Sequence, residues 1–159
     1  MATPLAFEPH NHAECVADAL ITAERRCRET GARLTPQRRR VLEILLESHR
    51  ALGAYELLSR LADEGRAVQP TIVYRALDFL VAQGLVHKIA RLSAFVACTR
   101  PKSGHGPAFL VCRACRGVAE AELDAVQGAL DMLAKESGFA LELMVLEAEG
   151  LCPGCRPAA

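Results

Sequence analysis

The chain of 159 residues contains no tryptophan, and aromatic residues make up only 4% of it. This scarcity disfavours a stacking platform for single-stranded nucleic acid, because such platforms depend on exposed aromatic rings. No apolar run approaches the roughly 20 residues that a membrane-spanning helix needs. The amino terminus also lacks the basic segment and apolar block of a secretory signal. We therefore expect a cytoplasmic protein without a membrane partner.

Hydrophobic residues nevertheless account for 51% of the chain and charged residues for 24%, which is typical of a globular protein with a real core. The net charge is zero, with 19 basic and 19 acidic residues. Residues 1–100 hold 14 of the basic and 11 of the acidic residues, so the acidic excess lies in residues 101–159. This asymmetry suggests two modules, of which the first is the candidate for binding nucleic acid.

Helix start and stop signals divide the first module. An amphipathic helix is predicted over about 13–30, and Thr35 followed by Pro36 is a start signal for the next one. A short helix follows, and another begins at Pro70 and stops at Gly84. Two β-prone runs, LVHKIA and AFVACT, come next. Helices followed by a hairpin are the order of a winged helix-turn-helix.

The second module begins after a segment rich in Gly, Pro and Ser, RPKSGHGP. We predict a strand at AFLVC, a helix from Leu123 to Ser137, and a long strand over 139–152. The fold class is therefore α+β. We predict a winged-helix domain over residues 1–99, of which 1–12 form a flexible tail. A linker follows over 100–107, and a small α/β dimerisation domain covers 108–159.

The predicted helix that begins at Pro70 has two contrasting faces. Its apolar residues recur at helical spacing on one side, and Thr71, Tyr74 and Arg75 lie on the other, near the end where a recognition helix meets base edges. Arg75 is suited to fork onto the two acceptors of a guanine. An ordinary solvated face accounts for the pattern equally well. The candidate phosphate contacts nearby are Arg33, Arg38, Arg39 and Arg40, with Tyr55 beside them.

Seven cysteines in a reducing compartment are better interpreted as metal ligands, catalytic thiols or core residues than as disulfides. Cys112 and Cys115 form one C-x-x-C pair, and Cys152 and Cys155 form a second after 36 intervening residues. Each pair provides two thiolates for a tetrahedral zinc ion, and four thiolates leave no open position. We predict a structural zinc site. The alternative, a redox pair in a thiol oxidoreductase, is opposed by the doubled motif and by the absence of a thioredoxin-like βαβ context.

The stretch HGPAFLVCRACRGVAE also contains His105 and Glu120, which need other partners if the two cysteines are already used. His87 and Cys98 lie in the predicted hairpin. Two imidazoles, a thiolate and a carboxylate would suit zinc better than iron or manganese. Spacing alone does not establish this second site, and Glu122 competes with Glu120. His10 and His12 form either a weak further site or part of the flexible tail.

Five motifs together resemble the ferric uptake regulator family of metal-dependent repressors. They are LTPQRRRVL, PTIVYRALDFL, GLVHKI, the block with His105, the first C-x-x-C and Glu120, and the terminal CPGC. The resemblance covers about residues 20–156 and is strongest to the members that regulate zinc uptake. It implies a homodimer that binds palindromic double-stranded DNA and represses zinc uptake genes. It does not imply an enzyme, nor any small-molecule substrate beyond the metal ion.

The resemblance also implies two zinc ions per protomer, one structural and one regulatory. The regulatory ligands that it implies are His87, Cys98, His105 and Glu120, and the implied DNA-reading residues are Tyr55 and Arg75, with Thr71 and Tyr74 beside them. Iron-sensing members usually carry a histidine-rich run before the first C-x-x-C, which this chain lacks. The alternatives are an iron, manganese or peroxide sensor of the same family, and a DNA-binding module whose zinc ions are both structural.

Overall fold

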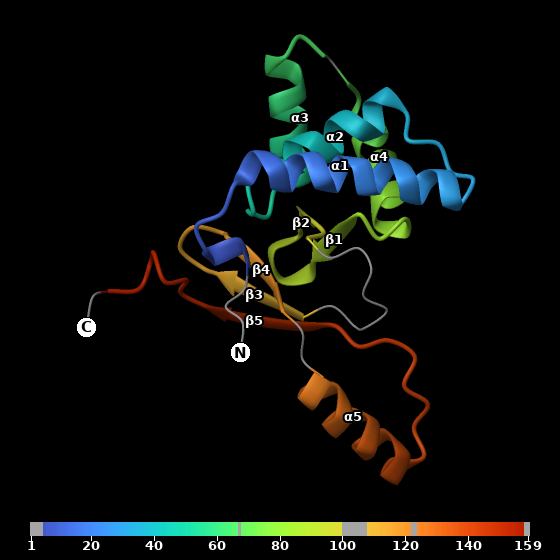
Figure 1. Cartoon of the computed structure of the whole chain (residues 1–159), viewed down its shortest axis with the longest axis vertical. Coiled ribbons are helices and arrows are strands. Elements are labelled where there is room, and N and C mark those ends of the chain that lie inside the picture. Colours follow the sequence, from blue (N-terminus) through green and yellow to red (C-terminus); the bar gives the residue numbers. More distant parts are fainter. Residues whose placement is uncertain (1–4, 67, 100–107, 122–123, 158–159) are drawn as a thin grey trace. The chain divides into compact units, whose positions relative to one another are not determined.

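The computed structural model describes residues 5–66, 68–99, 108–121 and 124–157. These residues form two compact units, one spanning 9–99 and the other combining 5–8 with 108–157. The predicted linker over 100–107 lies outside the described residues. Each unit has its own helices and its own sheet (Figure 1).

The first unit consists of helices followed by a two-stranded hairpin. Its elements are α1 (His12–Glu29), α2 (Pro36–Leu46), α3 (Ala54–Asp63), α4 (Pro70–Ala82), β1 (Val86–Ile89) and β2 (Ala94–Ala97). The two strands pair in antiparallel register, with His87 opposite Val96. Ala90–Leu92 form a 3-10 turn between them, and Ser93 follows with a left-handed φ of 47°. The predicted winged helix-turn-helix is confirmed.

Local signals fix the helix ends of this unit. The Thr35 hydroxyl accepts a hydrogen bond from the backbone N–H of Arg38 at 3.4 Å, and Pro36 occupies the first turn of α2. Gly84 follows α4 with a φ of 66°, a left-handed conformation that glycine adopts without steric cost. The Leu85 backbone N–H then bonds to the Leu80 carbonyl at 2.9 Å. Both boundaries agree with the start and stop signals in the sequence.

The core of the first unit lies where α2, α3 and α4 pack together. Eight aliphatic side chains from these helices are completely buried: Val41, Ile44, Leu45, Leu57, Leu61, Val73, Leu77 and Leu80. Burial of each such side chain contributes on the order of 1.5–3 kcal/mol. This core holds the outer face of α4 and the hairpin in fixed positions relative to each other.

The second unit is built on a three-stranded sheet. Its elements are the 3-10 turn η1 (Leu5–Phe7), β3 (Ala108–Cys112), β4 (Val118–Ala121), α5 (Asp124–Ser137) and β5 (Leu146–Gly150). The strand order is β4-β3-β5 (Figure 1). β3 pairs with β4 in antiparallel and with β5 in parallel register, so that Cys112 lies opposite Gly150. The carboxyl ends of β3 and β5 therefore meet at one edge of the sheet.

The predicted long strand over 139–152 is wrong in extent, because the strand covers only Leu146–Gly150. A strand persists only where it has a hydrogen-bonded neighbour, and the pairing of this segment with β3 covers Leu146–Gly150. Residues 139–145 lie outside the named strands of the described chain. Several of their apolar side chains are exposed, notably Leu143 at 74% and Phe139 at 66%.

Part of the segment that is expected to form a flexible tail over 1–12 is described. Residues 5–12 are described, and Leu5–Phe7 belong to the second unit rather than to the winged helix. Phe7 lines an apolar pocket with Leu110 and Val111 of β3. An aromatic ring that covers exposed sheet surface is stabilised by the hydrophobic effect, and this accounts for the order of the segment.

Candidate metal centres and DNA-reading face

The four cysteines of the two C-x-x-C pairs meet beyond the paired ends of β3 and β5. Cys112 is the last residue of β3, and Cys115 lies in the turn that follows it. Cys152 and Cys155 come directly after β5. All four sulfur atoms lie within 4.8 Å of one another. The parallel pairing of β3 with β5 thus brings together two motifs that are far apart in the sequence.

Backbone N–H groups point at these sulfur atoms. The Cys152 N–H donates to Cys112 Sγ and the Gly117 N–H donates to Cys115 Sγ, both at 3.4 Å. Hydrogen bonds from the backbone of Cys115 and Cys152 lower the pKa of the Cys112 thiol to about 6. The pKa of Cys155 is raised to about 12 because it shares hydrogen bonds with the other three sulfurs. Such crowded thiols ionise together only when a cation lies between them.

The spacing of the sulfurs fits zinc. Cys115 Sγ lies 3.8 Å from Cys152 Sγ, and bonds of about 2.3 Å in a tetrahedron place sulfurs about 3.8 Å apart. The turn after Cys115 also fits the site, although Arg116 rather than glycine adopts the left-handed conformation there, with a φ of 61°. The four-cysteine cluster is thus arranged as a closed tetrahedral donor set.

The residues expected at the regulatory site fall in both units. His87 lies on β1 and Cys98 directly follows β2, and a ring nitrogen of His87 lies within 4.8 Å of Cys98 Sγ. The Cys98 N–H bonds to the Leu85 carbonyl at 2.9 Å, which fixes its place at the base of the hairpin. Glu120 lies on β4 of the second unit and is half-buried. His105 and Glu122 lie outside the described residues.

The outer face of α4 is arranged as expected. Thr71, Tyr74 and Arg75 are exposed, whereas Val73 and Leu77 on the opposite face are completely buried. Tyr55, in the first turn of α3, is 76% exposed. A phenol that is so exposed contributes nothing to the core, and its ring and hydroxyl are accessible to a partner. These side chains are therefore available to a partner in the groove of a nucleic acid.

The arginines at the start of α2 differ in their availability. Arg38 packs over the Phe79 ring, 3.6 Å from its centroid, and donates to the Arg33 carbonyl at 2.7 Å. Arg39 and Arg40 form ion pairs within the unit, with partners Glu24, Glu43, Glu47 and Glu64. Arg33 is exposed. The structure therefore gives the three arginines of α2 packing or ion-pair roles, and Arg33 is the better candidate for contact with phosphate.

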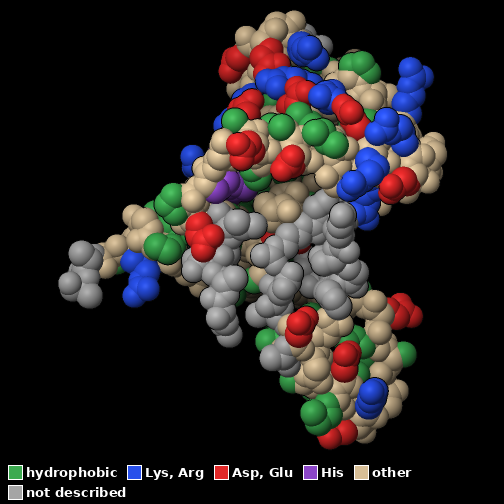
Figure 2. Space-filling view, viewed as in Figure 1, with side chains coloured by type: hydrophobic (Ala, Val, Ile, Leu, Met, Phe, Trp, Pro, Cys, Tyr) green, Lys and Arg blue, Asp and Glu red, His purple; other side chains and the backbone are tan. Residues whose placement is uncertain are grey.

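Charges of both signs alternate on the visible face of the helical unit (Figure 2). In the described part of the chain, no helix is long and apolar enough to cross a membrane.

A third group of candidate ligands was missed in the sequence, where only His10 and His12 were considered. These two residues lie with Cys15 and His49, and one ligand atom of each is within 4.8 Å of the others. Burial, followed by the charges of His10 and His12, lowers the pKa of His49. The H-x-H-x-x-C spacing was the available signal, since His12 and Cys15 share the first turn of a helix.

A helix-turn-helix with a hairpin wing, in one chain with a closed four-thiol cluster, defines a winged-helix protein of the metal-regulated class. The ferric uptake regulator family model matches residues 29–149, and the chain belongs to this family. It is 39% identical to the zinc uptake regulation protein of Escherichia coli (strain K12) over 139 residues, covering 87% of this chain and 81% of that protein.

Two solved structures are also similar. A zinc uptake regulator complexed with zinc and DNA aligns with a TM-score of 0.82 and 38% identity, covering 88% of this chain and 94% of that one. The holo form of XcZur aligns with a TM-score of 0.77 and 41% identity, covering 87% and 96% respectively. The similarity thus extends over both units of the chain.

Proposed function

We propose that the chain is a zinc-responsive transcriptional repressor that binds palindromic double-stranded DNA as a homodimer and controls zinc uptake genes. One structural zinc ion and one regulatory zinc ion per protomer are its cofactors. It acts as a regulator rather than an enzyme, and a reducing compartment such as the cytoplasm keeps its thiols able to bind metal. The similarity to zinc uptake regulators supports this proposal.

The observation that carries the proposal is the pairing of His87 with Cys98 at the base of the hairpin, within 4.8 Å. A site made of an imidazole and a thiolate favours zinc over iron and manganese, which are harder ions and bind carboxylate oxygen more readily. Both residues belong to the same unit as the exposed face of α4. A metal ion held by this pair would therefore act directly on the DNA-binding unit.

Regulation follows if residues of the second unit complete the site. We propose that His105 and Glu120 are the ligands that the second unit contributes to the regulatory ion, and Glu120 lies on β4. Ligands from both units would restrict the orientations that the winged helices of a dimer adopt, and so favour those that match two half-sites. By linkage, zinc and DNA then strengthen each other's binding by the same factor, typically about 5- to 150-fold.

Exposed apolar side chains in the second unit support its role in dimerisation. They lie on β3, on α5 and in the segment after it, and they are Leu110, Met132, Leu133, Phe139 and Leu143. Covering these side chains with a partner protomer would remove apolar surface from water, which favours association. In a homodimer the same surface of both protomers would be covered at once.

The proposed metal preference is tested by operator binding of the full-length dimer at controlled free metal concentrations. We expect zinc to raise operator affinity about 5- to 150-fold over the form that holds only the structural ion. Iron(II) and manganese(II), tested anaerobically at the same free concentrations, should not raise operator affinity. Activation by iron or manganese instead of zinc would assign the chain to the alternative sensors of its family.

Replacement of Arg75 by alanine tests the DNA-reading face. Loss of a bidentate contact to guanine should cost about 1–3 kcal/mol at one operator position and relax the preference for that base. Arg33→Ala is the matched comparison. Loss of a phosphate contact should weaken binding to operator and random DNA alike, and should reduce the slope of log affinity against log salt concentration by about one. Equal effects of both changes on both DNAs would exclude base reading by Arg75.

A further inference from the structure

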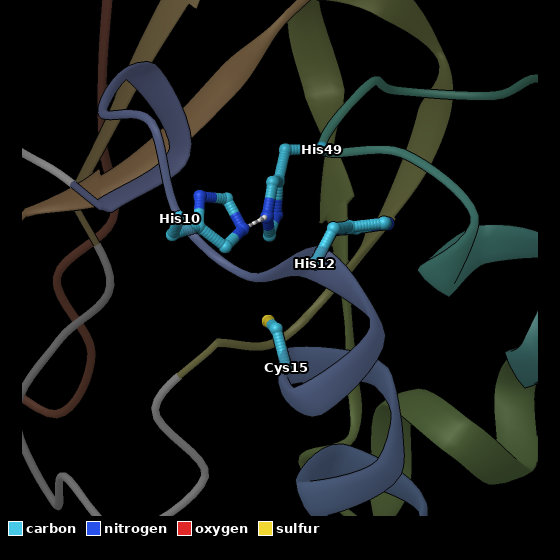
Figure 3. Close-up of side chains that lie close together, drawn as sticks. All are labelled: His10, His12, Cys15 and His49. Atoms are coloured by element: carbon cyan, nitrogen blue, oxygen red, sulfur yellow. Dashed lines mark hydrogen bonds between the residues drawn. The ribbon is translucent and has the colours of Figure 1, made fainter.

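Three imidazoles and a thiol converge at the amino-terminal end of α1. Figure 3 shows His10, just before the helix, with His12 and Cys15 on its first turn and His49 from the loop after α2. All four belong to the DNA-binding unit. One ligand atom from each lies within 4.8 Å of the others, so a single ion is within reach of all four.

Hydrogen bonds orient the three rings. Nε2 of His12 lies 3.0 Å from the Glu47 carbonyl oxygen, to which it donates, and this leaves Nδ1 with its lone pair as the ligand atom. Metal-binding histidines are commonly held in this way by a backbone carbonyl. His10 Nε2 and His49 Nε2 lie 3.0 Å apart, close to the separation of about 3.3 Å between two nitrogens on one tetrahedral zinc.

A backbone hydrogen bond fixes the position of Cys15 in the first turn of α1. The Cys15 N–H bonds to the Asn11 carbonyl at 3.1 Å, which begins α1, whereas the Asn11 side chain makes no capping hydrogen bond. Burial, followed by the charge of Asp18, raises the pKa of the Cys15 thiol, so a bound cation would be needed to hold Cys15 as a thiolate at neutral pH. Cys15 and His49 also line a cavity of about 200 Å³ that extends to Cys98.

We propose that His10, His12, Cys15 and His49 bind a further zinc ion, distinct from the structural and regulatory ions. Three nitrogens and one sulfur form a donor set typical of zinc among the abundant divalent metals, and four protein ligands leave no position for substrate. The ion would fasten the start of α1 to the loop after α2 within the DNA-binding unit. Cys98 lines the same cavity as Cys15 and His49, so the proposed site would lie next to the regulatory site.

The test uses the full-length dimer with zinc retained in the four-cysteine site and with Cys98→Ser introduced, so that the regulatory site has no thiolate. Titration with Co²⁺ reports tetrahedral binding by visible absorption and thiolate ligation by a near-ultraviolet charge-transfer band. We expect one equivalent of Co²⁺ per protomer to produce both signals. Additional replacement of Cys15 by serine should remove the charge-transfer band. Additional His49→Asn should weaken Co²⁺ binding at least about 10-fold.

Thr22→Val is the matched control, since Thr22 lines the same cavity on α1 but is uncharged and lies outside the four ligands. It should leave both signals unchanged, and circular dichroism verifies that every variant is folded. A Cys98→Ser chain without a charge-transfer band, or one whose band survives Cys15→Ser, would overturn the proposal. Operator binding is not part of this readout, so a failure here is distinguishable from a failure of the proposed zinc response.

Discussion

Cys152→Ser is expected to unfold the second unit and abolish dimerisation, while the winged helix stays folded. The substitution removes one of four thiolates from a closed site whose metal supplies folding free energy, on the order of 10–16 kcal/mol for complete sites in small zinc domains. That amount is comparable to the whole stability of a domain, about 5–15 kcal/mol. Zinc content, light scattering after size exclusion and limited proteolysis measure the outcome.

The winged helix should stay folded when the second unit unfolds, because the two units have different sources of stability. The first has a core of completely buried aliphatic side chains. The second is a small sheet whose β3 and β5 are joined where the four sulfurs meet. Proteolysis of the variant should therefore leave a protected fragment that corresponds to residues 9–99.

Cys15→Ser is the control for this experiment, because it also removes one thiol but from the other unit. That variant should remain a dimer whether or not Cys15 binds a metal. If Cys152→Ser also stays dimeric and keeps its full zinc content, the four cysteines do not form a structural zinc site.

The sequence predicted the elements whose causes are local. Thr35 with Pro36 at the start of α2, and Gly84 after α4, act through the conformations of one or two residues, and these signals are visible without any tertiary information. The faces of α4 were equally accessible, because the spacing of Val73 and Leu77 defines which side of the helix is buried.

The sequence could not predict features that arise from packing. His10 and His49 are 39 residues apart and meet only because the start of α1 lies beside the loop after α2. The packing of the Arg38 guanidinium over the Phe79 ring was likewise not predictable from the sequence, where Arg38 is a candidate phosphate contact. The start of β5 at Leu146 likewise depends on its pairing with the neighbouring β3.

The four-cysteine site lies between these two cases. The spacing of Cys112 and Cys115, and of Cys152 and Cys155, was sufficient to predict one shared ion. The parallel pairing of β3 with β5, which brings the two pairs together, was not contained in that spacing. The ligands of the regulatory site were harder still to predict, because a lone histidine or cysteine on a strand carries no signal of its own. Only the resemblance to a family selected His87 and Cys98.

Cys98→Ser is expected to abolish the response to zinc without affecting the fold. The hydroxyl of serine stays protonated at neutral pH and is a poor substitute for a thiolate, so the regulatory ion should be lost while the structural ion remains. Operator affinity should then stay at the zinc-free level, about 5- to 150-fold below that of the zinc-loaded wild type. Zinc content and operator binding, each measured with and without a moderate chelator, provide the comparison.

Cys27→Ser is the matched control for this change, since Cys27 is another buried thiol of the same unit, and it lies in the hydrophobic core rather than in a ligand cluster. Both substitutions bury a hydroxyl, at a cost of about 1–3 kcal/mol in stability if it lacks a hydrogen bond. Only Cys98→Ser should remove the zinc response, because only Cys98 is paired with His87. A Cys98→Ser dimer that still binds its operator more tightly with zinc would show that the regulatory ion is held elsewhere.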